Sequence, residues 1–119
     1  MANHHLFGTT GEQLAGNYLQ QRGFKILFTN WRYSHYEIDI IASKNNVVHF
    51  IEVKSRRSVL FGYPEEAVSR KKFNNLKQAA VAFQYLQPQT INIQFDILSI
   101  LAEKDKPIAY FFIEDVYLY

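Results

Sequence analysis

The chain has 119 residues, a length that ordinarily forms one domain around a single hydrophobic core. Hydrophobic residues make up 48% of it and charged residues 20%, a balance that argues against intrinsic disorder. The net charge of +2 is mild, so bulk charge neither requires nor excludes a nucleic-acid partner. The absence of cysteine excludes disulfides, thiolate zinc sites and cysteine nucleophiles. With no apolar run near the roughly 20 residues of a membrane span, and no signal-peptide pattern, we expect a cytoplasmic protein without a membrane partner.

The first expected element is a helix. Thr9 or Thr10 suits its N-cap, and Glu12 stands near the capping-box spacing. Apolar residues continue at helical spacing, and Gly23 suits the C′ position that ends the helix.

Three strands are expected next, over residues 25–31, 36–43 and 47–55, because these runs are apolar and rich in β-branched or aromatic side chains. Asn45 and Asn46 predict a tight turn between the second and third of them. These two strands should therefore form a hairpin.

The second half of the chain predicts a long helix and two further strands. Pro64 suits the first turn of a helix that runs to about Leu86. Strands are expected over 90–101 and 108–113. The helix has one apolar stripe, formed by Phe73, Leu76, Ala80 and Phe83. The order α-β-β-β-α-β-β predicts an α/β fold with a mixed central sheet between two helices.

Acidic and basic side chains converge on the predicted hairpin. Strand alternation places Glu52 and Lys54 on one face of their strand, and the hairpin places Asp39 opposite Glu52 and Glu37 opposite Lys54. Adjacent carboxylates repel each other unless a cation lies between them, and their oxygens suit Mg²⁺ or Mn²⁺. Lys54 can position a water or stabilise a phosphate charge. Glu12, on the inward stripe of the first helix, could share such a metal.

A structural interpretation of the same residues stays open. Glu37 and Lys54 could form an ordinary cross-strand ion pair on a surface hairpin. Glu12 could simply be an acidic residue that favours the N-terminal end of its helix. The agreement of three separate segments favours the metal site.

Short motifs along almost the whole chain resemble those of a known family. Asp39 followed by Glu52-Val53-Lys54 resembles the PD-(D/E)xK nuclease signature without its proline. The chain is also similar to the YraN-type family of predicted nucleases. The motifs that carry this similarity are Gly8-x-x-Gly11-Glu12, Asn30-Trp31-Arg32, Glu37-Ile38-Asp39, Glu52-Val53-Lys54-Ser55-Arg56, Phe61-Gly62 and Phe95-Asp96.

The resemblance implies a single restriction-endonuclease-like domain over residues 1–119, similar to archaeal Holliday-junction resolvases. It implies an active site of Glu12, Asp39, Glu52 and Lys54, in which the three carboxylates hold Mg²⁺ or Mn²⁺. Two positions depart from the family pattern. Tyr36 stands where glycine is usual, and Gln94 stands where arginine is usual.

Cations near these motifs are expected to bind nucleic acid through its phosphates. They are Arg56, Arg57, Lys71 and Lys72. His49 points away from Glu52 in the predicted strand and is expected to be structural. We expect a metal-dependent endonuclease that acts on DNA, including branched DNA. Two alternatives stay open. The first is a nucleic-acid-binding module without cleavage, and the second is an interaction protein that forms a homodimer through its last strand, near Tyr117 and Tyr119.

Overall fold

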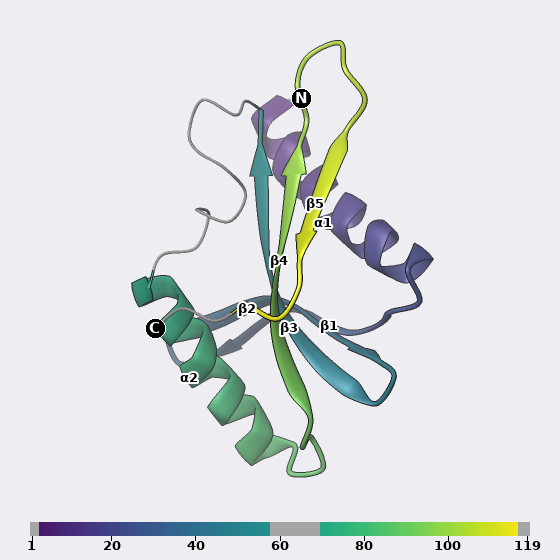
Figure 1. Ribbon diagram of the computed structural model, residues 1–119. Coiled ribbons are helices and arrows are strands. Elements are labelled where there is room, and N and C mark those ends of the chain that lie inside the picture. The colour runs from purple at the N-terminus through teal and green to yellow at the C-terminus, as the bar shows by residue number, and fades with distance from the viewer. Residues whose placement is uncertain (1–2, 58–69, 117–119) are drawn as a thin grey trace.

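The protein is seen here as a computed structural model that describes residues 3–57 and 70–116, with the backbone alone for 3–10. The order of elements is α-β-β-β-α-β-β, as the sequence predicts (Figure 1). The elements are α1 (Asn3–Gln21), β1 (Lys25–Tyr33), β2 (Tyr36–Lys44), β3 (Val47–Arg56), α2 (Arg70–Leu86), β4 (Ile93–Leu101) and β5 (Ala109–Ile113).

The five strands form one mixed sheet in the order β1-β2-β3-β4-β5. Neighbouring strands are antiparallel except β3 and β4, which run parallel. A parallel pair needs a long crossover connection, and α2 lies in the segment that joins β3 to β4. The crossover brings α2 back across one face of the sheet, so a helix residue can meet residues of β3 that are distant in sequence.

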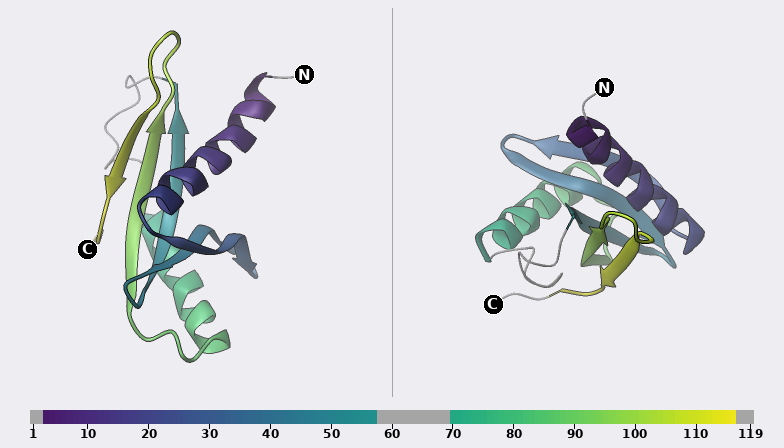
Figure 2. Two further views of the ribbon diagram at one scale, coloured as in Figure 1. Left: turned by 90° about the vertical axis from the view of Figure 1, so that its right-hand side faces the viewer. Right: turned by 90° about the horizontal axis from the view of Figure 1, so that it is seen from above.

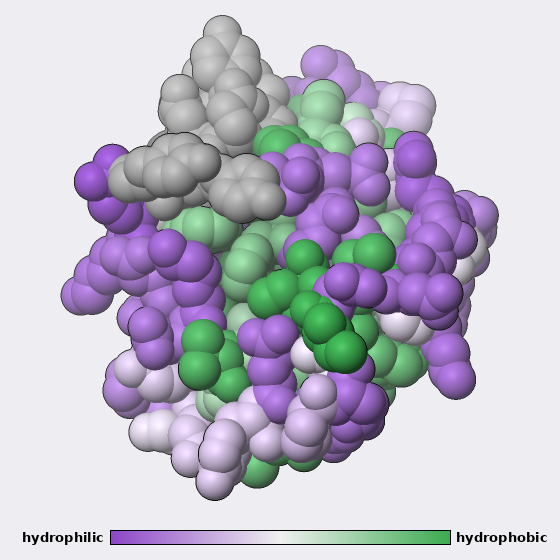
Figure 3. All heavy atoms as spheres, turned by 60° about the horizontal axis from the view of Figure 1, so that its bottom comes forward, coloured by the Kyte–Doolittle hydropathy of each residue, from purple (hydrophilic) through white to green (hydrophobic). Residues whose placement is uncertain are grey.

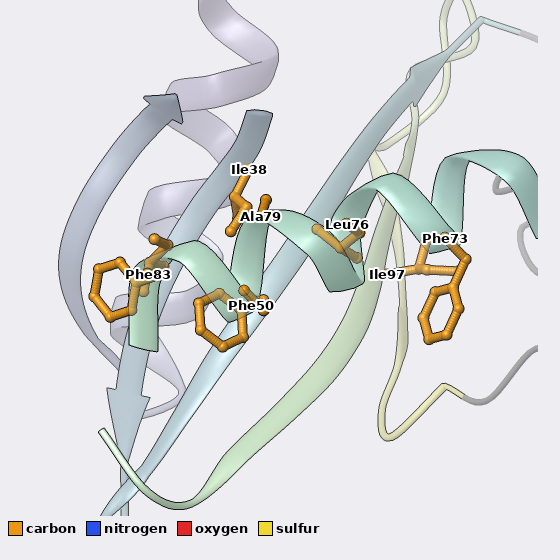
Figure 4. Close-up of a cluster of buried hydrophobic side chains, with 9 residues drawn as sticks. Ile38, Phe50, Phe73, Leu76, Ala79, Phe83 and Ile97 are labelled. Carbon is orange, nitrogen blue, oxygen red and sulfur yellow. The ribbon is translucent and has the colours of Figure 1, made fainter. Parts of the chain in front are cut away.

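The two helices cover opposite faces of the sheet (Figure 2). On one face, buried side chains of α2 pack against Ile38, Phe50 and Ile97 of three different strands (Figure 4). On the other face, Ala15 and Leu19 of α1 pack in a second cluster of buried side chains. Both clusters are closely filled by apolar groups, so the polar side chains buried beside them need partners of their own.

The start of α1 differs from the prediction, whereas its end agrees. The helix begins at Asn3 and runs through Thr9 and Thr10, so neither threonine is its N-cap. A capping pattern is a local preference that continuing helical hydrogen bonds can override. At the other end, Gly23 has a φ of +89° and its N–H donates to the Gln20 carbonyl. This is the C′ glycine expected from the sequence.

The hairpin between β2 and β3 forms through the predicted turn. Asn45 and Asn46 have φ values of +53° and +64°, which fit a type I′ turn. The predicted register holds from the turn as far as Ile40, which pairs with Ile51. The ladder ends there, so the expected continuation of pairing to Asp39 is not formed.

The expected pairing of Glu37 with Lys54 is also not formed, because β2 has parted from β3 at this point. Glu37 instead pairs with Arg32 of β1, whose Nη2 lies 2.6 Å from Glu37 Oε2. This exposed ion pair belongs to the β1–β2 ladder and contributes little to stability.

The remaining boundaries are close to those expected. β4 begins at Ile93 rather than residue 90, and β5 at Ala109. The predicted helix start at Pro64, the motif Phe61-Gly62 and the C-terminal tyrosines Tyr117 and Tyr119 lie outside the described residues. Within the described parts, neither helix has the length and apolar character to cross a membrane.

The surface carries several large hydrophobic side chains. Figure 3 shows hydrophobic side chains gathered among hydrophilic ones on one face of the molecule. Among the described residues, the most exposed of these are Tyr85 at 81%, near the C-terminal end of α2, and Ile91 at 78%, in the connection to β4.

A candidate cation site between two strands and a helix

Glu52 is a buried carboxylate that is paired with a lysine. Strand alternation turns Glu52 to the same face of β3 as Phe50, which is the face covered by α2. Its side chain is only 8% exposed, and a charge so deeply buried needs a partner. Lys72 of α2 supplies one, with Nζ 2.6 Å from Glu52 Oε1. The crossover helix thus delivers a cation to the strand.

Asp39 lies beside this pair and is held by the backbone of β3. The N–H of Val53 donates to Asp39 Oδ2 at 2.8 Å, at the point where the β2–β3 ladder has ended. The side chain therefore takes over a backbone donor that a longer ladder would have used. This bond fixes Asp39 next to the strand that carries Glu52, although the two residues are not paired in the ladder.

Burial and a neighbouring charge raise the pKa of Asp39 to about 6. Burial is the larger cause, and the negative charge of Glu52 adds to it. The Val53 N–H and the ammonium of Lys72 act in the opposite direction. A carboxyl group with this pKa gains from any further cation that enters the site, because a cation favours its ionised form.

Two lysines complete the cluster. The pKa of Lys54 is lowered, chiefly by its close contact with Lys72, then by burial and by the positive charge of Lys72. Burial acts to lower the pKa of Lys72, but its hydrogen bond to Glu52 and the negative charges of Glu52 and Asp39 outweigh burial and raise it. Asp39, Glu52, Lys54 and Lys72 thus form one charged network from β2, β3 and α2.

Glu12 is placed differently from the other predicted site residues. It is exposed on α1, and its Oε2 accepts a hydrogen bond of 3.3 Å from Asn30 of β1. Among the side chains that the structure describes, at 11–57 and 70–116, no three His, Asp or Glu residues form a group that could hold a metal ion. The structure therefore brings Asp39, Glu52 and Lys54 together but does not bring Glu12 to them.

The donors of this site fit a hard divalent cation. Two carboxylates from adjacent strands supply the oxygen ligands that Mg²⁺ and Mn²⁺ prefer. A positively charged group, the ammonium of Lys72, already lies at hydrogen-bond distance from Glu52. Asp39 would hold the ion together with Glu52, and Lys54 lies beside both.

The sequence interpretation assigned Lys72 to phosphate contact and did not predict its contact with Glu52. Helical spacing carries the missing signal. Lys72 stands four residues before Leu76, so it extends the buried stripe of α2 toward the N-terminus, whereas Lys71 lies on the exposed side. A lysine on the inward stripe of a helix that crosses the sheet is placed to meet an acid there.

His49 and Asp96 form a second buried polar pair, on the opposite face of the sheet. His49 Nδ1 donates to Asp96 Oδ2 at 2.6 Å, and the His49 ring contacts Phe24 of the core beneath α1. The other Asp96 oxygen accepts hydrogen bonds of 2.9 Å from Gln94 Nε2 and from the Asp115 N–H. His49 thus faces away from Glu52, as the sequence predicts, and Gln94 supports Asp96.

The other cations that are predicted to contact nucleic acid differ in exposure. Arg57 and Lys71 are exposed and Arg56 is half-buried. Tyr36 is half-buried and packs against the core beneath α2, so its ring has a structural role in this fold.

Comparison with known proteins places the chain in a family. Residues 11–100 match the model of "Uncharacterised protein family UPF0102". A UPF0102 protein of Syntrophomonas wolfei is 44% identical over 100 residues, which is 83% of this chain and 87% of the relative. One of Bacteroides thetaiotaomicron is 40% identical over 103 residues, covering 87% and 85%. One of Chloroherpeton thalassium is 38% identical over 119 residues, covering 93% and 92%.

The matches to the relatives extend over most of each chain. The range matched by the family model includes Asp39, Glu52, Lys54 and Lys72. These matches agree with the family that the sequence motifs resemble. The chain belongs to the uncharacterised protein family UPF0102.

Proposed function

We propose that the protein is a metal-dependent endonuclease that hydrolyses phosphodiester bonds of DNA, including branched DNA. The observation that carries the proposal is the placement of Asp39, Glu52 and Lys54 in one network that already contains a cation at Glu52. The PD-(D/E)xK resemblance of these residues and the restriction-endonuclease-like order of elements support it.

Each residue of the network has a proposed task. Asp39 and Glu52 would hold Mg²⁺ or Mn²⁺, and the ion would supply Lewis-acid chemistry to the phosphodiester. Lys54 holds the attacking water or stabilises the charge that develops on the phosphate. Glu12 remains the proposed third ligand, and in this structure its carboxylate is engaged by Asn30.

The substrate is proposed from the cations around the site. Arg56 is the last residue of the strand that carries Glu52, Arg57 follows it, and Lys71 is exposed beside Lys72. Arginine and lysine side chains of this kind bind phosphates irrespective of base sequence. They would place a backbone phosphate over the carboxylates.

A cleavage assay tests the proposal. Single-stranded, duplex and four-way-junction DNA are incubated with the protein and Mg²⁺ or Mn²⁺, and the products are resolved on denaturing gels. We expect metal-dependent cleavage that Glu52→Gln abolishes and Lys54→Met reduces by about 10²-fold or more. Both variants keep the shape of the replaced side chain, so circular dichroism should show an unchanged fold.

The same assay separates the alternative of a binding module without cleavage. Such a module would bind DNA in a salt-dependent manner without needing Asp39 or Glu52. Intact DNA under every metal condition, together with tight binding by the Asp39→Asn and Glu52→Gln variants, would establish the alternative.

A further inference from the structure

We propose that Lys72 is a resident cation of the site, which a divalent metal must displace before it binds. The inference rests on the proposed metal site and concerns how that site is regulated. In the absence of metal, the ammonium of Lys72 neutralises Glu52. When the metal enters, Lys72 leaves Glu52 and becomes available to a substrate phosphate.

The position of Lys72 on α2 supports this role. Lys72 continues the stripe formed by Leu76, Ala80 and Phe83, all of which are buried against the sheet. The apolar part of the helix is therefore anchored against the sheet (Figure 4). Lys72, one turn before Leu76, reaches Glu52 of β3 from this anchored helix. The contact with Glu52 follows from the fold and not from a chance encounter of surface side chains.

The two partners differ in exposure, and this difference allows exchange. The Glu52 side chain is 8% exposed, whereas the Lys72 side chain is 41% exposed. The Glu52 carboxylate is held within the strand, whereas Lys72 has a long, flexible side chain that is partly exposed to solvent. Lys72 can therefore withdraw without any movement of the backbone.

A metal ion and an ammonium group compete for the same oxygens. Lys72 Nζ lies 2.6 Å from Glu52 Oε1 and also contributes positive charge at Asp39. A divalent ion bound to both carboxylates would place a second positive charge next to the ammonium. Lys54 lies beside Lys72, so the repulsion between their two positive charges falls when Lys72 moves away.

Because the Lys72–Glu52 contact must break before the metal binds, the free energy of that contact is subtracted from the free energy of metal binding. A hydrogen bond between charged groups, partly screened by solvent, corresponds to about a tenfold change in affinity. Removing the ammonium should therefore tighten metal binding, which is the reverse of the effect of removing a ligand or a helpful charge.

Calorimetric titration of Mn²⁺ into the full chain tests the proposal without DNA. We expect Lys72→Met to bind Mn²⁺ about tenfold more tightly than the wild type. Lys77→Met is the matched control, because it removes the same charge from an exposed position of the same helix. Its Mn²⁺ affinity should equal that of the wild type.

Thermal unfolding is the second measurement, because the substitution at Lys72 should also lower the stability of the protein. Lys72→Met leaves Glu52 buried without its ion pair, so the metal-free variant should unfold at a lower temperature, and Mn²⁺ should raise its Tm by more than it raises that of the wild type. Lys72→Gln, which retains a hydrogen-bond donor, is used where Lys72→Met does not fold. Its Mn²⁺ affinity should also exceed that of the wild type.

The outcomes separate this inference from the proposed function. Equal or weaker Mn²⁺ binding by Lys72→Met and Lys72→Gln, with clear binding by the wild type, would overturn the displacement of Lys72 and leave the metal site standing. Absence of Mn²⁺ binding by the wild type and by both variants would overturn the metal site, and the displacement with it.

Discussion

Asp39 combines burial, a carboxylate neighbour and a backbone hydrogen bond at one residue. Its pKa is raised from 3.8 to about 6, so between these two values the folded chain binds a proton that the unfolded chain has released. The stabilisation is complete below pH 3.8 and is lost as the pH rises through about 6. Ionised Asp39 therefore opposes folding at neutral pH in the absence of metal.

Replacing Asp39 with asparagine should remove this pH dependence. The amide oxygen can still accept the Val53 N–H, but it cannot ionise. We expect Asp39→Asn to exceed the wild type in free energy of unfolding by on the order of 2 kcal/mol at about pH 7, with the gain shrinking toward about pH 4. Urea denaturation at a series of pH values measures the difference. A gain that is the same at every pH would contradict the assigned cause.

Asp96 is a fully buried residue whose three hydrogen bonds define a structural role. Asp96→Ala would leave His49, Gln94 and the Asp115 N–H without their acceptor. We expect a loss of about 3–5 kcal/mol in the free energy of unfolding. Glu114→Ala, at an exposed carboxylate, is the control and should change stability by less than about 0.5 kcal/mol. An equal effect of the two substitutions in urea denaturation would refute the role of Asp96.

At the scale of single elements, two glycines of α1 differ in the space around them. A Cβ added at Gly11 would lie 2.5 Å from Ser55 Oγ, whereas one added at Gly16 would have no neighbour within 4 Å. Gly11 therefore permits the close approach of α1 to β3. Gly16 has no such packing role, and its main effect is to give the unfolded chain more conformational freedom.

Alanine substitutions separate these effects. Gly16→Ala should raise the free energy of unfolding by about 0.5–1 kcal/mol through helix propensity. Gly11→Ala should gain less, because Ser55 must turn away. In a Ser55→Ala background the two substitutions should become equally stabilising, which a double-mutant cycle by thermal unfolding measures. An identical gain from Gly11→Ala with and without Ser55 would show that the approach is not tight.

The elements also show what sequence can predict. The turn at Asn45 and Asn46, the register next to it and the face of β3 that carries Glu52 depend on local geometry, and these predictions are confirmed. The end of the β2–β3 ladder at Ile40 is not visible in the residue pattern, because it depends on how the sheet twists. The strands of Glu37 and Asp39 were therefore predicted correctly, but their partners, Arg32 and the Val53 N–H, were not.

At the scale of the whole molecule, the site depends on contacts between distant segments. Lys72 meets Glu52 because α2 crosses over the sheet between two parallel strands, and helical spacing alone could only have indicated that Lys72 points inward. The sheet also separates two polar clusters. The charged network lies beneath α2, and the buried pair of His49 and Asp96 lies on the side of α1. Substitutions in one cluster should leave the other unchanged.

The central claim is that Asp39 and Glu52 together form a site for a divalent cation. Calorimetric titration of Mn²⁺ into the wild type and into the double variant Asp39→Asn, Glu52→Gln tests it most directly, because both substitutions keep the side-chain shape and remove the charge. The account predicts one bound Mn²⁺ per chain for the wild type and none for the double variant. Equal binding by the two proteins, or none by a folded wild type, would contradict it.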